Sequence, residues 1–168
     1  MSKKILFLGH DAGRTGAPLL LLALISWIKN NSDLRMELLL KSGGPLEQDY
    51  SKQIPIGIWS EKIRKYNFGF MRAWLRRARI MKWEDPSWNK LYLPEEYPVV
   101  YANTVVTLDE ALKFRAPGRS IILHIHEMKE TVEHFSMREK LKATASQVDC
   151  FIAASHAVES YLLNKGLA

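Results

Sequence analysis

The residues best suited to chemistry lie just after short apolar runs. The first set, residues 9–16, contains three glycines and leads from the apolar run 3–8 into an amphipathic run. A strand, a glycine-rich turn and a helix N-terminus present free backbone N–H groups and the positive end of a helix dipole. This pattern suits an anion such as a phosphate, with Thr15 and Gly16 nearest the helix start. The alternative is a turn that needs its glycines only for positive φ.

A second set of polar residues follows the apolar run 99–101. Asn103 and Thr104 can both donate and accept hydrogen bonds, as contacts with sugar hydroxyls require. Ligands of open α/β sheets bind outside the carboxyl ends of the strands, so this position favours a role in binding. The alternative is that one of the two residues caps a following helix.

Histidines mark the end of the next apolar run, at residues 120–124. Alternation puts His124 and His126 on the same side if the strand continues through them, and Glu127 follows directly. Two strand histidines without further nearby ligands do not favour a metal site, so we expect no metal. A histidine beside a carboxylate at a strand end favours contact with a ligand. A capped or buried structural histidine is the alternative.

A serine closes the last apolar run, at residues 150–153. Ser155 precedes a histidine, but such neighbours are not by themselves a catalytic pair, and a Gly-x-Ser-x-Gly motif is lacking in the sequence. The alternative for Ser155 is the N-cap of the final helix. Because parallel strands share one carboxyl edge, we expect Gly16, Asn103, His126 and Ser155 to converge there.

Positioning these residues requires alternating strands and helices. Short runs that are apolar on both faces predict buried parallel strands, with helices between them. This alternation predicts an α/β fold: a three-layer, Rossmann-like, doubly wound parallel sheet with helices on both faces. Strands are expected at residues 3–8, 35–41, 54–58, 99–101, 120–124 and 150–153. Helices are expected at residues 18–30, 46–52, 72–82, 108–114, 136–146 and 156–165.

The composition fits one domain over residues 1–168. The chain is 47% hydrophobic, which is ordinary for a soluble globular protein. Its single cysteine excludes an internal disulfide and agrees with a reducing compartment. Its apolar runs are too short for a signal peptide or for a bilayer span, which needs about 20 residues. We therefore expect a cytoplasmic protein.

The net charge of +6 comes from one segment. Residues 61–82 hold eight basic residues and one acidic residue, while the rest of the chain holds 16 basic and 17 acidic residues. A helical wheel places Arg72, Arg76 and Arg79 opposite an apolar sector, as in helices that lie on anionic membranes. The alternative is an ordinary surface helix. The sequence contains no recognised nucleic-acid-binding motif, so we expect no nucleic-acid partner.

Five short motifs resemble the N-terminal half of family-4 retaining glycosyltransferases, which have the two-domain GT-B fold. They occur in the family's order and span nearly the whole chain. The motifs are Thr15-Gly16-Ala17-Pro18, Gly43-Gly44-Pro45-Leu46, Tyr101-Ala102-Asn103-Thr104, His126-Glu127 and Ala154-Ser155. The first motif departs from the family's frequent pair of glycines, because a threonine precedes its glycine.

The resemblance implies a hexosyltransferase that uses a nucleotide sugar as donor, with no metal or other cofactor. Gly16, with Thr15, would approach the donor diphosphate through its backbone N–H, and His126 would be the catalytic residue that contacts the donor sugar. The remaining polar residues at the strand ends would line the cleft on the acceptor side. These are Asn103, Thr104, Glu127 and Ser155.

The resemblance also implies partners and limits. The acceptor would be a glycan or a lipid-linked molecule at the inner face of the membrane, where Arg72, Arg76 and Arg79 would contact anionic lipid. The C-terminal domain of the family, which would make most of the contacts with the nucleotide sugar, is absent from these 168 residues. We therefore expect this domain alone to be inactive in sugar transfer.

Two other functions stay open. Another nucleotide-binding enzyme on a Rossmann-like sheet should have a dinucleotide loop, but Asp11 stands where that loop needs a glycine. Such an enzyme should also have an acidic residue closing its second strand, where this chain has Lys41 and Ser42. The other alternative is a non-enzymatic α/β interaction module.

Overall fold

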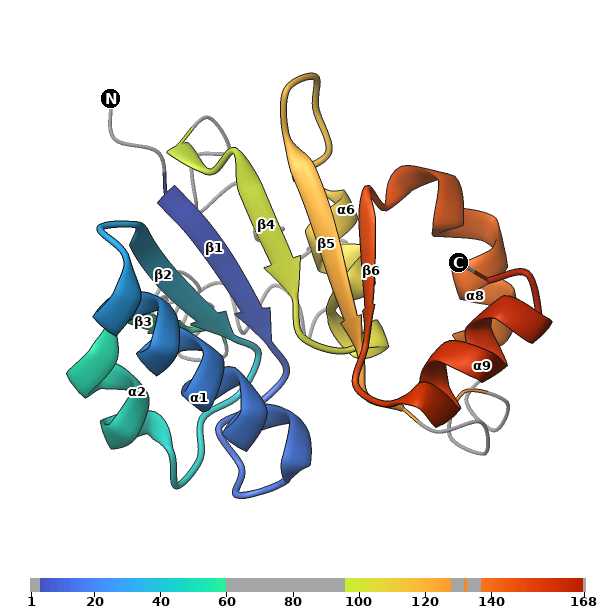
Figure 1. Cartoon of the computed structure of the whole chain (residues 1–168). Coiled ribbons are helices and arrows are strands. Elements are labelled where there is room, and N and C mark those ends of the chain that lie inside the picture. The colour runs from blue at the N-terminus through green and yellow to red at the C-terminus, as the bar shows by residue number, and fades with distance from the viewer. Residues whose placement is uncertain (1–3, 60–95, 128–131, 133–136, 168) are drawn as a thin grey trace, which may run out of the picture.

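Six parallel strands form a single sheet in the order β3-β2-β1-β4-β5-β6 (Figure 1). The computed structural model describes residues 4–59, 96–127, 132 and 137–167. This arrangement confirms the predicted Rossmann-like α/β fold. The strands are β1 (Lys4–Gly9), β2 (Arg35–Leu40), β3 (Ile56–Ile58), β4 (Val99–Ala102), β5 (Ser120–Ile125) and β6 (Cys150–Ala153).

Helices connect the strands. α1 (Gly16–Asn31) joins β1 to β2, and α2 (Glu47–Gln53) joins β2 to β3. A 3-10 turn, η2 (Val105–Thr107), leads into α6 (Leu108–Leu112) after β4. α8 (Met137–Thr144) and the 3-10 turn η3 (Ala145–Gln147) precede β6, and α9 (His156–Asn164) follows it. The helix predicted at residues 72–82 lies outside the described residues, and no described helix is long and apolar enough to cross a bilayer.

Alternate residues of the central strands serve opposite faces of the sheet. Leu6 and Leu8 of β1 belong to one apolar core, whereas Phe7 belongs to another. α1 and α2 cover the face of Phe7, while α6, α8 and α9 contribute to the core on the opposite face (Figure 1). Helices therefore lie on both faces, as the three-layer prediction requires.

The strand order reverses between β1 and β4. The chain moves outward from β1 to β2 and β3, then returns to pair β4 with the other side of β1. The loops that leave β1 and β4 consequently diverge at the same edge, which is where open α/β sheets bind ligands. The N–H of Asn103 donates to the Leu8 carbonyl at 2.9 Å, so the segment after β4 is held against the end of β1.

Several predicted ends move by one or two residues. The strand predicted at residues 54–58 begins at Ile56, because the Ile54 N–H donates to the Tyr50 carbonyl and closes α2. The helix predicted at residues 108–114 ends at Leu112, and the Phe114 N–H makes a tighter bond to the Ala111 carbonyl. Neither difference moves a residue from one face of the sheet to the other.

Candidate functional site

A pocket of about 280 Å³ opens at the carboxyl edge of the sheet, beside the point where the strand order reverses. The loop after β1, the first turn of α1 and the segments after β4 and β5 all contribute to it. Its lining consists of His10, Thr15, Ala17, Pro18, Thr104, Val106, His126 and Glu127. Of the four predicted residues, His126 lines the pocket directly, and Gly16 and Asn103 adjoin it through their neighbours Thr15, Ala17 and Thr104.

The first turn of α1 forms one side of this pocket. The first N–H groups of an α-helix have no acceptor within the helix, and the Thr15 side chain makes no capping hydrogen bond to them. A Cβ added at Gly16 would meet no atom within 4 Å. The N-terminus of α1 is thus open, with the positive end of its dipole toward the pocket.

Positive φ does not explain the glycines of the first loop. Within the described ranges, φ is positive only at Thr104, Gly118 and Gly166. The alternative interpretation of residues 9–16, a turn that needs its glycines for positive φ, is therefore wrong. The N–H of Gly13 instead donates to the Asp11 carboxylate at 2.8 Å, which closes a local turn.

The Asn103 amide joins the first turn of α1 to the histidine after β5. Its Nδ2 donates to the Ala17 carbonyl at 3.1 Å, and its Oδ1 lies 3.0 Å from His126 Nε2. A carbonyl only accepts, so Nδ2 must face Ala17 and Oδ1 must face the imidazole. The Asn103 side chain therefore positions His126 relative to α1, and it does not cap a helix as in the alternative.

His126 is a partly buried, neutral imidazole. Burial lowers its pKa below the usual value for histidine. Because Asn103 Oδ1 can only accept, Nε2 carries the proton of the neutral ring and Nδ1 keeps its lone pair. The ring therefore offers a hydrogen-bond acceptor of the kind that a sugar hydroxyl satisfies.

His124 is held by contacts with neighbouring side chains of the protein. Its Nδ1 lies 2.5 Å from the Tyr101 hydroxyl, and its ring centroid lies 3.9 Å from that of His126. Burial, with a smaller contribution from His126, lowers the pKa of His124 to about 4. The two rings lie side by side as predicted, although β5 ends at Ile125 and does not continue through His126. The described residues contain no cluster of three or more potential metal ligands.

The Glu127 carboxylate ties the segments after β4 and β5 together. One oxygen accepts from the Val105 N–H at 3.0 Å, and the other accepts from the His126 N–H at 3.1 Å. Burial raises the pKa of Glu127, and these backbone donors oppose that rise. Although Glu127 lines the pocket, both of its oxygens are already engaged by the backbone.

Ser155 serves as the N-cap of α9. Its hydroxyl accepts from the Val158 N–H at 3.3 Å, and the residue is not part of the pocket lining. The structure thus supports the capping alternative for Ser155 rather than convergence with the other strand ends. The predicted membrane residues Arg72, Arg76 and Arg79 lie outside the described residues.

His10 is not among the residues predicted from sequence, although it lines the pocket directly after β1. Its Nε2 lies 3.1 Å from the Asp11 carboxylate, so this pair flanks the entrance to the first loop. The sequence contains a signal for His10, because this residue directly follows β1 just as Asn103 directly follows β4.

The fold has known counterparts among solved structures, although the sequence matches no family model and no curated protein. HepE (Alr3699) of Anabaena, solved with UDP and glucose, is 22% identical with a TM-score of 0.64, over 98% of this chain and 41% of that one. Its complex with UDP-glucose gives a TM-score of 0.60. The lipopolysaccharide outer core galactosyltransferase WaaB, in its apo form, is 18% identical with a TM-score of 0.60, over 98% of this chain and 43% of WaaB. This chain thus spans about two fifths of the length of these proteins, and the similarity shows the fold.

Proposed function

We propose that this chain is the acceptor-side domain of a family-4 retaining glycosyltransferase, which transfers a hexose from a nucleotide sugar to a glycan or lipid-linked acceptor. The observation that carries the proposal is the pocket in which the open N-terminus of α1 faces the neutral imidazole of His126. One group suits a phosphate and the other suits a sugar hydroxyl, and a nucleotide sugar contains both.

The two groups divide the chemistry between them. The N–H of Gly16 and the positive end of α1 would bind the donor diphosphate and stabilise the charge that develops on it as the sugar departs. His126 Nδ1 would accept a hydrogen bond from the donor sugar and hold it beside the phosphate. Because these groups supply the electrostatic stabilisation, the proposal includes no metal.

The solved neighbours support the choice of donor. HepE is described with UDP, glucose and UDP-glucose, and WaaB is named a galactosyltransferase. The proposal extends these ligand classes to this chain because the fold is the same and the pocket lies at the carboxyl edge of the sheet. A cytoplasmic location at the inner membrane face belongs to the same proposal.

The main competing function is a dinucleotide-dependent enzyme on the same sheet. Such enzymes hold the ribose with an acidic residue near the end of the second strand. Here β2 is followed by Lys41, whose N–H donates to the Gly9 carbonyl, and by Ser42, whose N–H donates to the His10 carbonyl. Neither side chain carries a carboxylate, so the end of β2 lacks the group that such enzymes use to hold the ribose.

The test is a titration of the 15N-labelled chain with UDP-glucose, in which binding is monitored through chemical-shift changes in 1H–15N spectra. We expect shifts concentrated at Thr15, Gly16, Ala17, Thr104 and His126. Gly16→Ala should fold normally, since its Cβ meets open space, yet weaken binding about tenfold or more by obstructing a charged ligand.

NAD serves as the ligand control in this titration. Binding of UDP-glucose with scattered shifts, equal binding by Gly16→Ala, or a preference for NAD would each contradict the proposed function.

A further inference from the structure

Thr104 has a backbone conformation that threonine rarely adopts. Its φ of 146° and ψ of 158° place it in a region that is essentially reserved for glycine. Among the described residues it is the only one other than glycine with a positive φ. Such strain costs free energy of folding, so its presence at a pocket points to a role for the side chain.

The Thr104 hydroxyl is buried without a partner. The residue is 7% exposed, and Oγ1 has no hydrogen-bond partner among the described residues. Burying a hydroxyl without a hydrogen bond is unfavourable, and native proteins rarely leave such a group unpaired. Valine would fill the same space without this penalty, and glycine would remove the strain.

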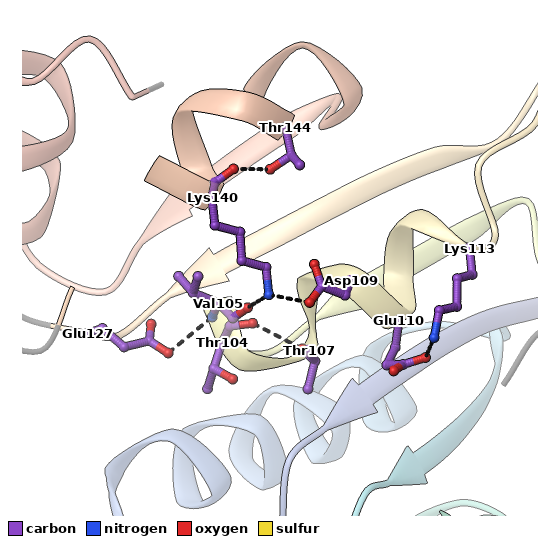
Figure 2. A network of polar contacts seen from close by, with 9 residues as sticks. All are labelled: Thr104, Val105, Thr107, Asp109, Glu110, Lys113, Glu127, Lys140 and Thr144. Atoms are coloured by element: carbon purple, nitrogen blue, oxygen red, sulfur yellow. Dashed lines mark hydrogen bonds and ion pairs between the residues drawn. The ribbon is translucent and has the colours of Figure 1, made fainter. Parts of the chain in front are cut away.

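The surrounding turn is, by contrast, closely held. The Thr107 hydroxyl donates to the Thr104 carbonyl at 3.0 Å, and the Val105 N–H donates to Glu127 (Figure 2). Lys140 reaches across from α8 to Asp109 at 2.8 Å and to the Val105 carbonyl at 3.5 Å (Figure 2). These contacts satisfy the Thr104 carbonyl and both backbone polar groups of Val105, but they do not involve the Thr104 hydroxyl.

We infer that Thr104 is a ligand-contacting residue, whose hydroxyl donates a hydrogen bond to an oxygen of a nucleotide sugar held in the pocket. Thr104 lines the pocket together with Ala17 and His126, and its side chain points away from η2 on the side of α1 (Figure 2). The inference rests on the proposed function and identifies one hydrogen-bond donor for its nucleotide sugar. The bound ligand supplies the partner that the protein itself does not.

The test compares Thr104→Val, Thr104→Ser and Thr107→Val in the 168-residue chain. Thr104→Val should have a Tm at least as high as that of the wild type, because an unpaired hydroxyl is replaced by a methyl group. It should nevertheless weaken UDP-glucose binding roughly fivefold or more. Thr104→Ser keeps the hydroxyl and should retain binding.

Thr107→Val is the matched control, since that hydroxyl has an acceptor at 3.0 Å and its loss should lower Tm. Titrations with UDP and with UDP-glucose show which oxygen is bound: equal weakening of both indicates a phosphate, and weakening of UDP-glucose alone indicates the sugar. Unchanged binding of both ligands by Thr104→Val, or a fall in Tm as large as that of Thr107→Val, overturns the inference. If the wild-type chain binds neither ligand, the donor contacts proposed for Gly16 and His126 are wrong and the inference fails with them.

Discussion

Asn103 and His126 are joined by a hydrogen bond of 3.0 Å between the amide oxygen Oδ1 and the imidazole nitrogen Nε2. The same amide holds the Ala17 carbonyl through Nδ2 at 3.1 Å. One side chain thus sets both the protonated nitrogen of His126 and its position relative to the N-terminus of α1. The two groups that the proposed function requires are therefore positioned by a third residue.

Replacing Asn103 by aspartate should charge this histidine. A carboxylate beside Nε2 favours the imidazolium form, so the pKa of His126 should rise from its lowered value. The aspartate also faces the Ala17 carbonyl without a donor, so the variant should be less stable than the wild type at neutral pH. The pKa is measured by NMR titration of the imidazole C–H resonances.

Asn103→Ala is the control for that titration, because it removes the same hydrogen bonds without adding a charge. If the pKa of His126 in Asn103→Asp does not exceed its pKa in Asn103→Ala, the proposed contact with Nε2 is wrong.

Stability should fall as the pH is lowered from about 6.5 toward 4. The unfolded chain binds a proton at the ordinary histidine pKa of about 6.5, whereas the pKa of folded His124 is lowered to about 4. In this window the unfolded state binds more protons, so the free energy of unfolding decreases by up to about 1.4 kcal/mol per pH unit. His126 acts in the same direction, while the raised pKa of Glu127 acts in the opposite one.

Thermal unfolding between pH 7 and pH 4 measures this effect. His124→Asn is the matched variant, because its Oδ1 can still accept from the Tyr101 hydroxyl but does not titrate. Its Tm should depend less steeply on pH than that of the wild type. Parallel pH profiles for the two proteins would show that His124 does not titrate as inferred.

The sheet could be predicted because its strands are buried on both faces. The run Ile5-Leu6-Phe7-Leu8 is continuously apolar and contributes to the cores on both faces of the sheet, and this pattern distinguishes central parallel strands from half-exposed ones. The ends of the strands depend on tertiary contacts, which the apolar pattern alone does not show. Ile54 continues the apolar pattern of its strand, but its N–H closes α2 instead.

The site could be predicted only in part. Asn103 and His126 were found because polar residues at the carboxyl ends of central strands lie near the point where strand order reverses. The φ angle of Thr104 could not be read from residue type, since threonine rarely adopts that conformation. For Ser155, capping and ligand contact predict the same residue type, so only the bond to Val158 distinguishes them.

Gly44 should be needed for full stability, whereas Gly16 should not. A Cβ at Gly44 would lie 2.6 Å from the carbonyl carbon and oxygen of Ala12, where the loops after β1 and β2 pack together. Gly44→Ala should therefore lower the free energy of unfolding by about 1–3 kcal/mol. Gly16→Ala, whose Cβ meets open space, should match the wild type in denaturant unfolding. Equal midpoints for all three proteins would show that the two loops do not approach each other as described.

Contact between the basic segment and a membrane remains a prediction from sequence, and binding to lipid vesicles tests it. Arg72, Arg76 and Arg79 share one side of the predicted helix, and each basic residue near an anionic surface contributes about 1 kcal/mol. Arg→Glu substitution at all three positions should abolish co-sedimentation of the chain with vesicles rich in anionic lipid. Vesicles of neutral lipid are the control, and there the wild type and the variant should behave alike. Retention of binding to anionic vesicles by the triple variant would exclude this segment as the membrane contact, because reversing three charges removes its electrostatic attraction.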